Sequence, residues 1–153
     1  MSPSPFGPHE RAVSNLSNQM YNSVAACNCN CTAYTGLDWI VQNDTVVRPN
    51  VMLVCGEQPE KHLERPPALV IEVLSDSTAE KDVTVKRELY ESQGIEHYLI
   101  VDTATKSICW LALQAKGQYE DVSAQIGPAG NFSVPLDNGC EIHFDRQAAL
   151  GIG

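Results

Sequence analysis

Apolar residues follow two different patterns along this chain. From His9 to Ala26 they recur every three or four residues, the spacing of one face of an α-helix. Ser77 and Glu80 have the spacing of a capping box, which predicts a second helix from about Thr78 to Ser92. Short apolar runs separated by turn residues indicate strands. The expected strands are Cys27–Ala33, Leu37–Val41, Val46–Val47, Val51–Cys55, Leu69–Ser75, Glu96–Asp102, Ser107–Leu113, Tyr119–Ala124, Phe132–Val134 and Cys140–Phe144.

This order of elements predicts an α/β or α+β fold in which helices pack on a mixed sheet. A last helical turn is expected near Arg146–Leu150. No internal repeat is visible, and 153 residues suit a single domain, 1–153, with one substantial core.

The run Leu69–Ser75 is apolar on both faces, as in a central strand covered by helices. It carries one charged residue, Glu72. A carboxylate buried there loses hydration free energy of the order of several kcal/mol unless a partner replaces the water. That partner could be a metal ion, a lysine or a set of hydrogen-bond donors.

The helix after this strand offers a partner. Asp82, Lys86 and Tyr90 are four residues apart, so they share a helical face, and Lys86 is expected to reach Glu72. Asp82 could instead pair with Lys86, and Tyr90 could be a packing residue whose hydroxyl meets a polar neighbour. Asn50 opens the neighbouring apolar strand and could point into the same space.

Four segments together resemble the Uma-type endonuclease family, a group of the restriction-endonuclease-like PD-(D/E)xK superfamily. Similarity is strongest over 46–102 and extends from about 1 to 150. An opening Met-Ser-Pro-Ser-Pro with His9 is similar to a recurrent segment of that family. The four segments are Asn50–Cys55, Pro67–Ser75, the spaced set Asp82, Lys86 and Tyr90, and Ile95–Asp102.

The resemblance implies a restriction-endonuclease-like fold, with a mixed sheet flanked by helices. It also implies Mg²⁺- or Mn²⁺-dependent hydrolysis of phosphodiester bonds in DNA. Glu72 matches the (D/E) of the motif, as catalytic and metal-binding residue. Leu74 stands in the usual lysine position, and Lys86 would replace that lysine from the helix. The supporting residues would be Asp82, Tyr90, Ser75 and His9.

The sequence departs from the family pattern in two ways. Asn50 stands where the family has a metal-binding aspartate, so a neutral amide oxygen replaces a charged ligand. Longer relatives also carry an upstream strand, so the chain is expected to be short at its N-terminus and to leave a sheet edge exposed. Two interpretations remain open: a working metal site, or a catalytically silent homodimer or binding module.

Charge and composition limit the partners. A net charge of −9 argues against strong non-specific DNA binding, so DNA would have to meet a local group of Lys and Arg. The chain has no apolar run long enough to span a bilayer and no secretory signal pattern. A cytoplasmic protein without membrane contact is therefore expected.

Six cysteines are present, and without a secretory signal they are expected to be reduced thiols in the core. In a strand, Cys27, Cys29 and Cys31 would place three sulfur atoms on one face. Buried thiols are the favoured interpretation, because this spacing matches neither usual zinc motif. A zinc-binding module built on these three cysteines is the alternative.

Overall fold

The computed structural model describes residues 7–42, 44–74 and 79–151, apart from the side chains of 79–82. Its first helix, α1 (Gly7–Cys27), corresponds to the helix expected from His9. The apolar stripe of α1 is buried through Ala12, Leu16 and Met20, each 0% exposed. Packing of this stripe, more than intrinsic propensity, stabilises the helix.

The main sheet has six strands in the order β1-β4-β5-β6-β7-β8. Strands β5 and β6 are parallel, and every other neighbouring pair is antiparallel. This mixed sheet with helices confirms the predicted fold class. The strands are β1 (Cys31–Tyr34), β4 (Val51–Cys55), β5 (Leu69–Leu74), β6 (His97–Asp102), β7 (Ser107–Leu113) and β8 (Tyr119–Asp121).

Two hairpins and the remaining helices complete the described chain. The helix α2 joins β5 to β6, which is the connection that a parallel strand pair requires. No described helix is both long and apolar enough to cross a bilayer. The elements are β2 (Trp39–Gln42) with β3 (Thr45–Val47), α2 (Ala79–Ser92), the 3₁₀ turn η1 (Ser123–Gln125), β9 (Asn131–Pro135) with β10 (Glu141–Asp145), and α3 (Arg146–Leu150).

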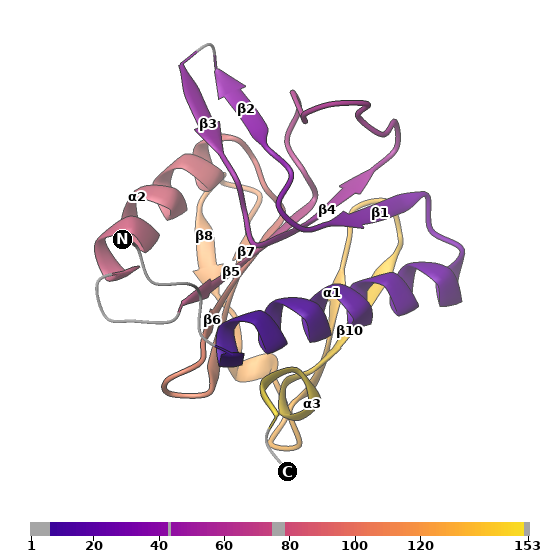
Figure 1. Cartoon of the computed structure of the whole chain (residues 1–153), viewed down its shortest axis with the longest axis vertical. Helices are drawn as coiled ribbons and strands as arrows, with labels where there is room; N and C mark the ends of the chain where they lie inside the picture. The colour runs from indigo at the N-terminus through magenta and orange to yellow at the C-terminus, as the bar shows by residue number, and fades with distance from the viewer. Residues whose placement is uncertain (1–6, 43, 75–78, 152–153) are drawn as a thin grey trace.

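The sheet is covered on both faces, and each face has its own core. Helices α1 and α3 and the β9–β10 hairpin pack on one face, and α2 with β2 lies on the other (Figure 1). Alternate residues of β5 divide between the two cores: Ile71 lies on the α1 side and Val70 on the α2 side. Glu72 has the parity of Val70, so its side chain points towards α2.

The expectation for the first cysteines was wrong. The structure ends α1 at Cys27 and starts β1 only at Cys31, because Asn28 adopts a left-handed backbone (φ 53°) that terminates the helix. The three sulfur atoms therefore do not line one face of a strand. Cys31 and Cys55 are direct partners across β1 and β4 and form a disulfide, which contradicts the expectation of reduced thiols.

Candidate functional site

Glu72 is held on the α2 face of the sheet by two side chains of that helix. The residue is 5% exposed. The hydroxyl of Tyr90 donates a hydrogen bond of 2.8 Å to Oε1 of Glu72. The ammonium Nζ of Lys86 lies 3.4 Å from Oε2. Each carboxylate oxygen thus has its own partner, and the predicted approach of Lys86 to Glu72 is confirmed.

Tyr90 is fixed by aromatic neighbours. Its ring is 0% exposed, stacks on Trp39 at a centroid distance of 6.0 Å and meets the ring of Tyr98 edge-on at 4.9 Å. Each such aromatic pair stabilises the fold by about 0.5–1.5 kcal/mol beyond the burial of area. The hydroxyl that orients Glu72 is therefore preorganised.

Asn50 directly precedes β4 and lies at the level of Glu72, because Val51 pairs with Ile71 in antiparallel register. Its Oδ1 accepts the backbone N–H of Val73 at 2.8 Å. The amide oxygen that would replace the family's aspartate therefore already bonds the sheet. A carboxylate at this position could accept the same N–H with one oxygen and keep the other for a ligand.

The structure shows no hydrogen bond or ion pair between the other described candidate, His9, and Glu72. His9 shares a surface pocket with Asn50 at the start of α1, and its Nδ1 lies 3.4 Å from Oε1 of Glu10. Arg48 also lines this pocket, and its guanidinium pairs with Asp38 at 2.7 Å. Ser75 and the side chain of Asp82 lie outside the described residues.

Residues 1–139 match the Uma2 family, described as "Putative restriction endonuclease". The chain belongs to this family. Its fold is similar to the crystal structure of a putative nuclease belonging to DUF820 from Anabaena variabilis, with a TM-score of 0.72 and 16% identity. That alignment covers 99% of this chain and 84% of the other. No curated protein matches.

Glu72 and Asn50 of this Uma2 protein offer Mg²⁺ the smallest number of carboxylate ligands that commonly holds the ion. One or two carboxylates, completed by waters and substrate phosphates, commonly hold that ion. Glu72 supplies one carboxylate and Asn50 one neutral oxygen. Within the described ranges, Glu72 joins no group of three or more clustered His, Cys, Asp or Glu donors. An ion held by these two residues would therefore be weakly bound, and water and substrate oxygens would have to complete its coordination.

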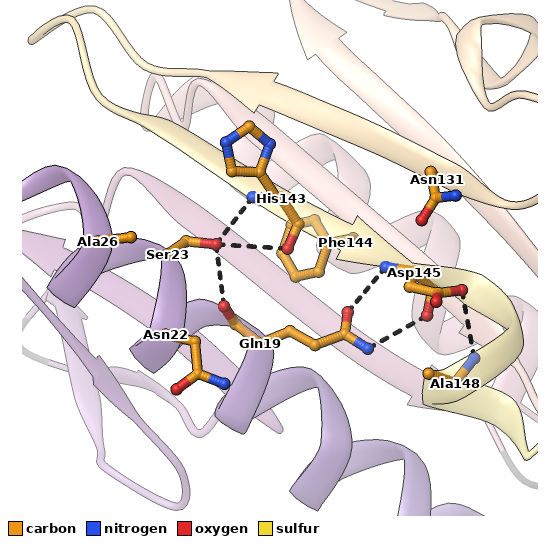
Figure 2. Close-up of a pocket in the computed structure, with 9 residues that line it drawn as sticks. All are labelled: Gln19, Asn22, Ser23, Ala26, Asn131, His143, Phe144, Asp145 and Ala148. Carbon is orange, nitrogen blue, oxygen red and sulfur yellow. Dashed lines mark hydrogen bonds between the residues drawn. The ribbon is translucent and has the colours of Figure 1, made fainter.

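A second pocket, between α1 and β10, is structural in character (Figure 2). Gln19 bonds both backbone groups of Asp145, accepting its N–H at 2.9 Å and donating to its carbonyl at 3.2 Å. The hydroxyl of Ser23 accepts the N–H of His143 at 2.9 Å. These polar groups attach the helix to the hairpin, so Glu72 remains the stronger functional candidate.

Sequence reasoning missed the aromatic support around Tyr90 and the backbone bond of Asn50. Trp39 comes from a hairpin whose position over the sheet no local pattern reveals. No local sequence pattern predicts that the amide of Asn50 bonds Val73, since the two residues are 23 positions apart.

Proposed function

We propose that this Uma2 protein is a metal-dependent endonuclease that hydrolyses phosphodiester bonds of DNA. The proposal depends on one observation: a nearly buried Glu72 whose Oε2 lies 3.4 Å from the Lys86 ammonium. The family resemblance assigns catalysis to such a pair: a carboxylate on a central strand and a lysine on the helix that follows it.

Each residue has a distinct part in this proposal. Mg²⁺ or Mn²⁺, when bound, would lower the pKa of a bound water and neutralise charge on the phosphate. Glu72 and the Asn50 amide oxygen would hold the ion. Lys86 offers a cation for a phosphate oxygen or the attacking water. Tyr90 fixes the orientation of Glu72 through its 2.8 Å hydrogen bond.

The second candidate function is that of a catalytically silent homodimer or binding module. It is favoured by the bond between Asn50 Oδ1 and the N–H of Val73, which engages the neutral oxygen that replaces a charged ligand. In that case the Glu72–Lys86 pair would be a buried ion pair that stabilises the site without metal chemistry.

The test is isothermal titration of Mn²⁺ into the natural protein, together with plasmid nicking in Mg²⁺ or Mn²⁺. Glu72→Gln keeps the shape of the side chain and removes its charge, so it is expected to abolish both binding and nicking. Lys86→Met is expected to abolish nicking and to retain the ion. Lys116→Met, at an exposed position, is the matched control and should behave as the natural protein.

Asn50→Asp separates the two candidate functions. For a working enzyme, this change should tighten Mn²⁺ binding by about tenfold or more, since a second carboxylate joins the site. The exposed Asn22→Asp, with the same change in charge, should leave binding unaltered. Metal binding that appears only in Asn50→Asp would overturn the enzymatic proposal and support the silent homodimer or binding module.

A further inference from the structure

Three cysteines from distant parts of the sequence meet at one end of α1. Cys27 ends the helix, Cys29 follows it, and Cys140 precedes β10, 111 residues further along the chain from Cys29. Their sulfur atoms lie within 4.8 Å of one another, and they are the one such group of metal-ligating side chains in the described part of the chain. Cys31, which the sequence grouped with them, pairs with Cys55 instead.

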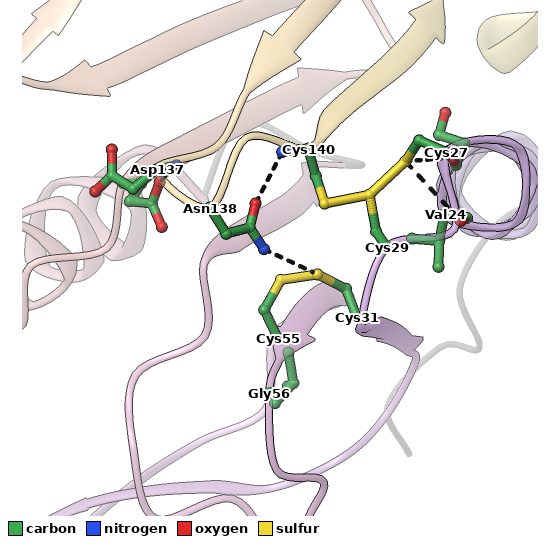
Figure 3. The surroundings of a disulfide bond; sticks show 12 residues. Val24, Cys27, Cys29, Cys31, Cys55, Gly56, Asp137, Asn138 and Cys140 are labelled. Carbon is green, nitrogen blue, oxygen red and sulfur yellow. Dashed lines mark hydrogen bonds between the residues drawn. A yellow bond between two sulfur atoms is a disulfide. The ribbon is translucent and has the colours of Figure 1, made fainter.

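The sulfur of Cys29 lies within bonding distance of two others. Figure 3 shows it joined both to Cys27 and to Cys140. One sulfur forms only one disulfide, so these two bonds are alternatives and either leaves the third cysteine as a thiol. A thiophilic metal ion is the partner that uses all three sulfur atoms at once.

The backbone around the cluster is arranged before any ion binds. Asn28, in the left-handed region, reverses the chain between Cys27 and Cys29, and the N–H of Cys29 donates to the carbonyl of Val24 at 3.1 Å. On the other side, the N–H of Cys140 donates to Oδ1 of Asn138 at 2.9 Å. Such support lowers the ordering free energy that a ligand site must otherwise supply.

The local electrostatics favour a cation. Cys27 occupies the carboxyl end of a 21-residue helix whose last turn holds no basic residue, so the negative end of the helix dipole is not offset there. The whole chain carries a net charge of −9. Cys29 and Cys140 are partly buried against the core while Cys27 is exposed, which gives an ion a path from solvent.

We infer that Cys27, Cys29 and Cys140 form a zinc site in the reduced protein. The three thiolates would hold Zn²⁺ and would leave its fourth ligand to water or another group. Binding releases the thiol protons and links the end of α1 to the β9–β10 hairpin. This site is separate from Glu72, so it stands independently of the proposed nuclease function.

The test uses the full chain, reduced with a phosphine that does not compete for metal, in the absence of oxygen. Co²⁺ serves as the spectroscopic probe. We expect one equivalent of Co²⁺ to produce thiolate-to-cobalt charge-transfer absorption, and Zn²⁺ to displace it. Cys140→Ser and Cys27→Ser should each lose most of this absorption. The second variant changes an exposed residue, so it tests the site even where Cys140→Ser misfolds.

Two controls exclude the other cysteines. Cys31→Ser should retain the absorption, which separates this site from the consecutive Cys27, Cys29 and Cys31 run. Cys109→Ser, which changes the described free cysteine, should also retain it. Absence of charge-transfer absorption in the reduced natural protein, or equal absorption in Cys27→Ser, would overturn the inference.

Discussion

Tyr90 is the residue through which the aromatic core reaches Glu72. Its hydroxyl donates to Oε1 of Glu72, while the ammonium of Lys86 lies beside the other oxygen, Oε2. Tyr90→Phe removes only the hydroxyl oxygen and leaves a buried carboxylate with one donor fewer. We expect the free energy of unfolding to fall by about 1.5–3 kcal/mol, the range for hydrogen bonds to charged groups.

The measurement for Tyr90→Phe is urea denaturation at neutral pH. Tyr21→Phe is the matched control because Tyr21 is 68% exposed, and it should unfold as the natural protein does. Equal stability of the two variants would show that the Tyr90 hydroxyl contributes nothing to holding Glu72.

His97 is buried in its neutral form, with a defined tautomer. The indole N–H of Trp110 donates to Nδ1 at 3.0 Å, so Nδ1 accepts, and Nε2–H donates to the carbonyl of Pro135 at 2.7 Å. Burial lowers the pKa of His97, although the Pro135 carbonyl acts in the opposite direction. Protonation of Nδ1 would also break the bond from Trp110.

This arrangement predicts lower stability in mild acid. The folded-state pKa of His97 lies below the unfolded value of about 6.5, so the unfolded chain binds more protons. The stabilisation is complete above about pH 6.5 and is lost as the pH falls towards the folded-state pKa. In His97→Gln, the stability difference between about pH 7.5 and 5.5 should shrink.

Chemical denaturation at several pH values measures this effect. His62→Gln, at a partly exposed histidine, is the matched control for the loss of a histidine side chain. An imidazole pKa of His97 at or above its ordinary value, determined by NMR titration, would contradict the prediction.

At the scale of elements, α1 packs on one face of the sheet together with α3 and the β9–β10 hairpin, and Leu16 lies fully buried on this helix. Leu16→Ala leaves a cavity that the sheet cannot fill by moving, so we expect a loss of about 2–5 kcal/mol in the free energy of unfolding. Val46→Ala, at a residue 55% exposed, should change it by less than about 0.5 kcal/mol. Thermal and urea unfolding of both variants would check this. If Leu16→Ala lost as little free energy of unfolding as Val46→Ala, the packing argument would be refuted.

How far the sequence predicts these elements depends on how local their determinants are. The strand β4 was predicted with its observed bounds, and β5 to within one residue, because continuous apolar runs between turns have few alternatives. The prediction of a strand from Cys27 was wrong, since cysteine suits helix and strand alike. The left-handed φ of Asn28 ends the helix there.

The candidate site divides in the same way. Lys86 was expected near Glu72 because a strand leading directly into a helix limits where that helix can pack. The position of Cys140 beside Cys29 depends on how the β9–β10 hairpin docks on α1, which no local pattern contains. The bond that engages Asn50 likewise arises only once β4 and β5 pair.

At the scale of the whole molecule, the sheet ends at two edge strands, β1 and β8. Among the described residues, β1 pairs with β4 alone, and Thr32 within β1 is exposed. Unpaired backbone groups at an edge are a template for another strand, which supports the expected homodimer. We therefore predict a particle of twice the 16.7 kDa chain mass by multi-angle light scattering.

Thr32→Lys tests whether this edge forms the dimer. A lysine on an edge strand opposes strand addition because two copies would bring like charges together. We expect the dimer dissociation constant to rise by about tenfold or more. A repulsion of about 1.4 kcal/mol between the two lysines would produce this change. Thr105→Lys, in the exposed turn between β6 and β7, introduces the same charge away from the edge and should leave the dimer intact. A natural protein that stays monomeric at high concentration would refute the edge-pairing prediction, whereas a dimer insensitive to Thr32→Lys would place the interface elsewhere.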